Sequence, residues 1–217
     1  LTFQVRLPDR QYSSEMPPGE HQYGRARINS AVEPMYESIL DRLRLLPGVL
    51  SVGAISWLPM NGLWGDVRVF DIVGRPPAGG QRPVAGYNPV DTDFFRTMRI
   101  PLARGRLFDK RDSATSPCVA IIDEALAARY WPGENPLGQH VSFATWGDPC
   151  PRQIVGIVGG VRHVGLGYVP RGSIYLPFVQ QPAETETARL ATRLHMSFVL
   201  RTSSGTGPSE ERLVRAV

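Results

Sequence analysis

The stretch "SAVEPMYESILDRLRLLPGVLSVGAIS", residues 30–56, decides the fold class, because a helix pattern is followed directly by a strand pattern. Its apolar side chains first recur every three or four residues, as on one face of a helix. That face carries Val32, Met35, Tyr36, Ile39, Leu43 and Leu46. Pro47 and Gly48 end the helix. Residues 49–56 are nearly all apolar, which is typical of a buried strand. We predict a helix over 34–46 and a strand over 49–56.

Strand patterns also occur at both ends of the chain. Apolar and polar side chains alternate over residues 1–7, as in a strand with one buried face. Over residues 195–201, Met196, Phe198 and Leu200 alternate with Ser197, Val199 and Arg201. Between the two ends, short apolar runs alternate with turn-rich segments, and a short helix pattern follows the apolar run at 119–122. The mixture of separate helix and strand patterns predicts an α+β fold.

Length and composition narrow the class of protein. The chain has 217 residues, enough for one large domain or two small ones, and its 22 Gly and 20 Pro predict short elements. The net charge is +4, but the basic side chains are scattered, so we expect a solvated surface and no nucleic-acid partner. No apolar run of membrane-spanning length and no signal peptide is found. We expect an excised piece of a longer polypeptide.

The stretch "IIDEALAARYWPGENPLGQHV", residues 121–141, allows two interpretations. Its acids and histidine could form an acid/base or metal cluster: Asp123, Glu124, Glu134 and His140. Alternatively, Asp123 caps a short helix that Pro132 and Gly133 end. We favour the structural interpretation, because Asp123 lies between an apolar strand pattern and a helix pattern.

Other motifs for chemistry are weak. The glycine-rich stretch 156–167 does not have the GxGxxG spacing followed by a helix, so we interpret its glycines as packing positions in a strand. The four histidines have no metal-ligand spacing. No GxSxG motif occurs. We therefore predict no catalytic residues, no cofactor and no metal site.

Two cysteines, Cys118 and Cys150, each precede an apolar strand pattern. If those strands are neighbours, the Cα atoms can approach within the roughly 4.4–6.8 Å that a disulfide requires. The alternative is a pair of buried, unbonded thiols. Either form is compatible with the sequence, and an oxidising compartment favours the disulfide.

The loop "SWLPMNGLWGD", residues 56–66, is unusually apolar. Such a loop either folds into the core or forms a contact patch for a partner. The candidate partner-contact patch consists of Trp57, Leu58, Met60, Leu63 and Trp64.

Four blocks along the chain resemble, in order, the MacB-like periplasmic core domain of FtsX-like ABC transporter permeases, in the branch of duplicated orphan permeases. They are "LDRLRLLPGVLSVGAISWLPMNG", "DTDFFRTMRIPLARGRLFDKRD", "VAIIDEALAARYWPGENPLGQHV" and "RQIVGIVGGVRHVGLGYVPRGSIYLPFVQ". The chain departs from that branch at Gly160, where an Asp is expected, and at Asp123, where Asn is usual. An acidic side chain at position 160 is therefore dispensable in this chain.

The resemblance implies an α+β fold with two subdomains. A porter-like α/β subdomain is built from both chain ends, residues 1–102 and 178–217. A mostly β subdomain, residues 103–177, is inserted between them. Helix 34–46 and strands 1–7, 49–56 and 195–201 would then share one sheet and one core.

The resemblance also implies a function. The domain lies on the periplasmic face of the cytoplasmic membrane, as part of a multi-pass protein, and couples ATP hydrolysis to export without being an enzyme. Its partners are the transmembrane helices of the same chain, an ATP-binding subunit, a second permease copy or half and, as an option, a periplasmic adaptor or outer-membrane channel. The alternative is an extracytoplasmic domain that senses a ligand or peptide.

Overall fold

The computed structural model describes residues 1–16, 25–60, 65–144, 148, 150–161, 167, 172–186, 194–203 and 207–217. The chain divides into two compact units, which we describe separately. The first unit contains Leu1–Ser56, Asp93–Arg99 and Ala183–Val217, and the second contains Trp57–Thr92 and Ile100–Pro182. The chain therefore passes between the units at four places, after residues 56, 92, 99 and 182.

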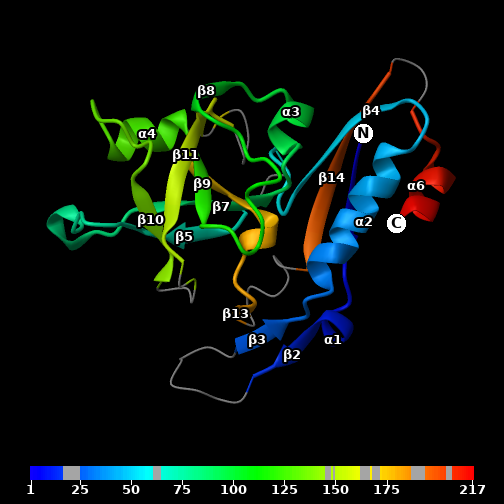
Figure 1. The fold of residues 1–217 in the computed structure, drawn as a ribbon, viewed down its shortest axis with the longest axis horizontal. Helices are drawn as coiled ribbons and strands as arrows, with labels where there is room; N and C mark the ends of the chain where they lie inside the picture. Colours follow the sequence, from blue (N-terminus) through cyan, green and yellow to red (C-terminus); the bar gives the residue numbers. More distant parts are fainter. Residues whose placement is uncertain are drawn as a thin grey trace. The chain divides into compact units, whose positions relative to one another are not determined.

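The main sheet of the first unit joins the two ends of the chain. Its strands, in spatial order, are β1 (Thr2–Arg6), β14 (His195–Thr202) and β4 (Val49–Ile55). Both pairings are antiparallel, with Phe3 opposite Phe198 and Phe198 opposite Ala54. Figure 1 shows these strands side by side. The predicted strands at 1–7, 49–56 and 195–201 are confirmed, and they share one sheet as the resemblance implied.

Two helices cover the two faces of this sheet. Helix α2 (Val32–Arg44) lies along β14 and β4 (Figure 1), and its buried Tyr36 ring is 6.2 Å from the Phe198 ring. Helix α3 (Phe94–Met98) packs on the other face, where a Cβ at Gly53 would lie 2.8 Å from the Phe94 Cα. Gly53 therefore permits the close approach of α3 to β4. The predicted helix over 34–46 is confirmed, although it begins and ends two residues earlier.

Small elements complete the first unit. They are α1 (Asp9–Tyr12), a sheet of β2 (Ser13–Glu15), β3 (Arg25–Ile28) and β13 (Glu184–Glu186), and helix α6 (Glu210–Ala216). The Ser209 side chain accepts a hydrogen bond from the Arg212 backbone N–H and so caps α6. Helix α6 packs beside α2 (Figure 1).

The second unit is built on a mixed sheet. Its strands, in spatial order, are β7 (Val84–Val90), β12 (Ser173–Pro177), β9 (Val119–Asp123), β11 (Arg152–Val158), β10 (His140–Ser142) and β6 (Asp71–Ile72). Strand β5 (Val67–Val69) pairs with β7, and β8 (Leu102–Gly105) pairs with β11. The β7–β12 and β9–β11 pairs are parallel, whereas β12–β9, β10–β11 and β10–β6 are antiparallel.

Helix α4 (Glu124–Tyr130) packs on this sheet and completes the core of the second unit. The core contains buried side chains from the sheet and from α4, among them Phe70, Tyr87, Ile122, Leu126, Trp131, Phe143 and Ile174. Two short 3-10 helices, η1 (Ala78–Gly80) and η3 (Phe178–Gln180), lie in the connections. The α+β fold class is therefore confirmed.

The boundaries between the two units require a correction. The resemblance implied that all of residues 1–102 belong to the first subdomain, but residues 57–92 and 100–102 belong to the second unit. The physical reason is the parallel pairing of β7 with β12, which places Tyr87 opposite Ile174 inside the second core. Residues 178–182 also belong to the second unit, because Gln180 is hydrogen-bonded within it.

Candidate functional site

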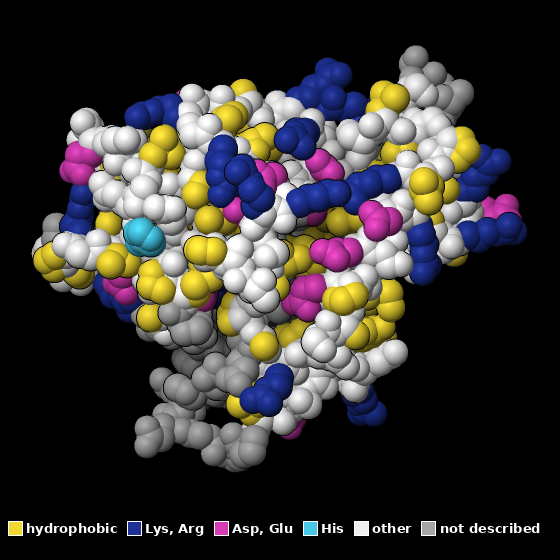
Figure 2. Space-filling view, viewed as in Figure 1, with side chains coloured by type: hydrophobic (Ala, Val, Ile, Leu, Met, Phe, Trp, Pro, Cys, Tyr) yellow, Lys and Arg dark blue, Asp and Glu magenta, His cyan; other side chains and the backbone are white. Residues whose placement is uncertain are grey.

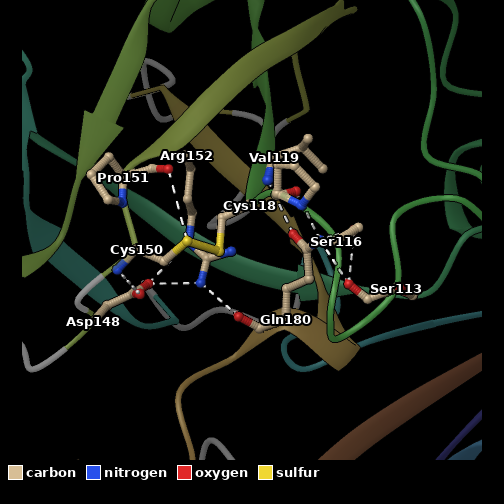
Figure 3. Close-up of a disulfide and its surroundings, with 10 residues drawn as sticks. Ser113, Ser116, Cys118, Val119, Asp148, Cys150, Pro151, Arg152 and Gln180 are labelled. Atoms are coloured by element: carbon tan, nitrogen blue, oxygen red, sulfur yellow. Dashed lines mark hydrogen bonds and ion pairs between the residues drawn. A yellow bond between two sulfur atoms is a disulfide. The ribbon is translucent and has the colours of Figure 1, made fainter.

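Cys118 and Cys150 lie at the starts of neighbouring parallel strands. Val119 of β9 is in register with Gln153 of β11, and the Gln153 N–H donates to the Cys118 carbonyl at 2.9 Å. The two Cα atoms are 6.2 Å apart, and the two sulfur atoms are bonded at 2.08 Å. The disulfide therefore ties the two loops that lead into these strands (Figure 3). Of the two alternatives that the sequence leaves open, the structure contains the bonded one.

A buried ion pair lies beside the disulfide. Arg152 Nε and Nη2 donate to Asp148 Oδ2 at 2.9 and 2.7 Å, and the side chains are 0% and 1% exposed. The backbone N–H of Cys150 donates to the other carboxylate oxygen of Asp148 at 3.2 Å. Asp148 thus connects the disulfide to the first residue of β11 (Figure 3).

Gln180 completes this cluster from the end of η3. Its Oε1 accepts from the Val119 N–H at 3.0 Å, and its carbonyl accepts from Arg152 Nη2 at 2.7 Å. Its Nε2 donates to oxygens of the loop before β9, those of Ser113, Ser116 and Pro117. We call Cys118, Cys150, Asp148, Arg152 and Gln180 the disulfide cluster. Because it joins three segments that are distant in sequence, it can hold the second unit rigid.

Sequence reasoning missed Asp148, Arg152 and Gln180. Arginine is mostly exposed in proteins, so an Arg that opens an apolar strand is normally expected to point into solvent. The signal that could have found the pair is the spacing Asp148-x3-Arg152 across Cys150, immediately before "QIVGIV". A second buried pair, Arg68 with Asp66 at 2.7 Å, lies in the same unit and places the guanidinium 3.6 Å from the centre of the Tyr87 ring.

The four candidate residues for an acid/base or metal cluster in residues 121–141 do not lie together in the structure. Asp123 is buried and caps α4 by accepting the Leu126 N–H at 2.8 Å, as the structural interpretation predicted. Glu124 and His140 are exposed, and Glu134 forms an exposed ion pair with Arg75. Across the described ranges, no group of three or more His, Cys, Asp or Glu residues could hold a metal ion.

Asp123 gives the second unit a pH dependence. Burial raises the pKa of its carboxyl from 3.8 to about 6, against the smaller opposing effect of the Leu126 hydrogen bond. Since the folded pKa is raised, the contribution of Asp123 to stability is largest below pH 4, falls by on the order of 3 kcal/mol as pH rises to about 6, and is then constant.

Asp123→Asn is expected to abolish this decline and to make the domain more stable than the natural chain at pH 7–8. Asn caps a helix as well as Asp does but cannot ionise. Urea unfolding of both proteins between pH 4 and pH 8 measures the effect. Parallel stability curves for the two proteins would contradict it.

The candidate partner-contact patch is only partly within the described residues. Trp57 and Leu58 are half-buried, and Met60 is 50% exposed. Met60 has a φ of 65°, which is uncommon for a non-glycine residue and marks a constrained turn. Leu63 and Trp64 lie outside the described residues. The patch therefore remains a prediction, with Met60 as its exposed member.

Comparison with known proteins identifies the family. The model of the MacB-like periplasmic core domain matches residues 10–211. The chain belongs to this family. Over 122 residues it is 30% identical to the macrolide export ATP-binding/permease protein MacB 2 of Aeromonas hydrophila subsp. hydrophila. This match covers 55% of this chain and 17% of the relative. The corresponding protein of Agrobacterium fabrum is 30% identical over 95 residues, covering 43% of this chain and 14% of the relative. The chain thus matches only a small part of these longer proteins.

Two solved structures have a similar fold. The periplasmic region of MacB from Actinobacillus actinomycetemcomitans has a TM-score of 0.54 at 16% identity, covering 82% of this chain and 71% of that one. The extracellular domain of the noncanonic ABC-type transporter YknZ from Gram-positive bacteria has a TM-score of 0.51 at 14% identity, covering 100% and 88%. Among the residues that the structure describes here, no helix is long and apolar enough to cross a membrane.

Proposed function

We propose that this member of the family is the extracytoplasmic part of an ABC transporter permease and that it transmits movement without catalysing a reaction. An ATP-binding subunit on the cytoplasmic side moves the membrane helices of the full-length chain, and the domain opens or closes against a second permease copy or half. The family match over residues 10–211 carries this proposal. From the relatives' names we extend export to this chain, but not the macrolide cargo.

The path of the chain supports a mechanical role. Both chain ends belong to the first unit, so movement of flanking segments would act on that unit first. Residues 93–99 belong to the first unit although the segments on either side of them belong to the second. In this proposal, movement of one unit reaches the other through the four covalent connections between them. Within the second unit, the disulfide cluster would resist deformation.

The loop at the start of the second unit is the partner contact in this proposal. Met60 is exposed and apolar, and its backbone is held in an uncommon conformation. An exposed apolar side chain on a constrained turn is suited to contact another protein. We assign this contact to the second permease copy or to a periplasmic adaptor or outer-membrane channel.

Met60→Glu in the full-length protein is expected to reduce transport several-fold while ATP hydrolysis continues, because a buried charge at the contact weakens it. The matched control is Val73→Glu, since Val73 is an apolar side chain of the same unit with 53% exposure. Transport and ATPase rates are measured side by side in proteoliposomes. Both variants should have the same unfolding temperature as the natural protein. Under that condition, equal transport by the two variants would contradict the assignment.

A further inference from the structure

The large apolar side chains that the described part of the first unit exposes lie at one end. Leu45, 83% exposed, and Leu50, 65% exposed, flank the turn from α2 to β4. The exposed apolar side chains of this end are Leu1, Leu45, Leu50, Val214 and Val217, and we call this set the apolar end. The described part of the second unit has only three such side chains, Met60, Val73 and Leu102.

Hydrogen bonds bring the turn and the first and last strands to the same place. The Ser203 N–H, just after β14, donates to the Gly48 carbonyl in the turn at 3.0 Å. The Leu200 N–H donates to the Leu1 carbonyl at 2.7 Å. Helix α6, which contains Val214 and is followed by Val217, packs beside α2. Figure 2 shows hydrophobic side chains interspersed with Lys and Arg side chains over this part of the molecule.

The turn is built to present leucines outward. Residues 45–50, "LLPGVL", contain no charged or hydrogen-bonding side chain. Gly48 has a φ of 79°, which lets the chain reverse direction tightly. Ser51 pairs with Arg201 but Val49 pairs with Thr202, so Leu50 is the extra residue of a β-bulge. Bulges redirect a side chain, and here the redirected side chain is an exposed leucine.

Arginines accompany these leucines. Arg42 and Arg44 lie in the last turn of α2, immediately before Leu45. Arg42 is exposed, and Arg44 pairs with Asp41 and Asp93. The turn thus exposes leucines and has an arginine in the preceding helical turn. This arrangement suits the interface of a bilayer, where apolar side chains contact acyl chains and arginine contacts phosphate groups.

We propose that the α2–β4 turn, residues 45–50, inserts Leu45 and Leu50 into the interfacial layer of the membrane, with Arg42 directed to lipid phosphates. This inference rests on the proposed function, in which the flanking segments of the longer chain lead into the membrane. The relatives extend far beyond the matched region, and such segments would join this domain at Leu1 and Val217, in the apolar end. The contact would give the first unit a fixed point against which it turns.

The test attaches the environment-sensitive dye NBD to the chain through Leu50→Cys. Both natural cysteines are bonded in the structure, so the introduced thiol is the one that reacts. A histidine tag placed before Leu1 tethers the protein to vesicles of phosphatidylethanolamine and phosphatidylglycerol that contain a nickel-chelating lipid. The matched control is Val73→Cys, which is similarly exposed at 53% but belongs to the second unit.

We expect a several-fold rise in NBD fluorescence for Leu50→Cys on tethering, quenching by lipids brominated in the acyl chain, and no change for Val73→Cys. Adding Leu45→Asp should remove the rise without changing the unfolding temperature, because Leu45 is 83% exposed. Equal signals at both positions would overturn the proposal. A rise without lipid that depends on protein concentration would also overturn it, in favour of a second copy as the occupant.

These vesicles contain neither ATPase nor cargo. A negative result therefore rejects the membrane contact and leaves the coupling function untouched, whereas the Met60 experiment can fail without affecting the lipid result.

Discussion

Replacing Arg152 with Met is expected to lower the free energy of unfolding of the second unit by about 3–5 kcal/mol. Arg152 is fully buried, and its guanidinium donates to both the Asp148 carboxylate and the Gln180 carbonyl. Without it, the Asp148 carboxylate is left in the interior with no compensating charge. The desolvation of that charge, more than the loss of the pair itself, sets the size of the effect.

The measurement is urea unfolding followed by tryptophan fluorescence. All four tryptophans, at positions 57, 64, 131 and 146, lie in segments of the second unit, so the signal reports on that unit. The matched control is Arg111→Met. Its pair with Asp109 has the same 2.7 Å separation but is exposed, so its loss should leave the unfolding midpoint unchanged.

A double variant separates the two causes. Asp148→Asn combined with Arg152→Met removes both charges and should recover a large part of the stability that Arg152→Met loses. If the double variant is as unstable as the sum of its single variants, the buried charge is not the cause. Equal unfolding midpoints for Arg152→Met and Arg111→Met would contradict the buried ion pair, because they would show that solvent reaches the Arg152 side chain.

Reduction of the Cys118–Cys150 disulfide is expected to cost about 3–4 kcal/mol of stability, again in the second unit. The bond closes a loop with a sequence separation of 32 residues, and the estimate follows from the entropy that this closure removes from the unfolded chain. Since Asp148 bonds to the Cys150 N–H, losing the disulfide also loosens one side of the buried ion pair. The two losses should therefore not be additive.

Hydrogen exchange detected by mass spectrometry locates this effect. In Cys118→Ala/Cys150→Ala, protection should fall in β9 and β11 but persist in β1 and β14, which belong to the first unit. Mass spectrometry of the natural protein without reductant should find a linked Cys118–Cys150 peptide. Two thiols that both react with an alkylating agent would refute the bond.

The sequence predicted the first unit well because its elements carry strong periodic patterns. Helix α2 has an apolar stripe, and strand β1 alternates, so their element types followed directly from spacing. Residues 195–201 were also predicted to be a strand, but β14 is buried on both faces and its burial does not alternate. The disulfide could be named as a candidate from the sequence, but the sequence did not decide between it and two free thiols. Both cysteines precede apolar runs, and such runs are strong candidates for neighbouring strands of one sheet.

The assignment of residues 57–92 failed for the opposite reason. Strand β7 belongs to the second unit because it pairs with β12, more than eighty residues later. The boundaries implied by the resemblance placed 57–92 with its neighbours in sequence, and an apolar run does not encode which distant run will pair with it, so the pattern could not correct them. The buried Arg152 was missed because its burial depends on Asp148 and Gln180 being brought to it by the fold.

The central claim is that the domain moves in response to ATP on the other side of the membrane. It is tested most directly by pulsed electron paramagnetic resonance on the full-length permease assembled with its ATP-binding subunit. Spin labels are attached through Val73→Cys, an exposed position of the second unit, and the distance between the two copies is measured with and without ATP under conditions that block hydrolysis. We predict that ATP shifts this distance to a new, narrow distribution. An unchanged distribution, in a sample whose membrane helices do respond to ATP, would contradict the coupling function.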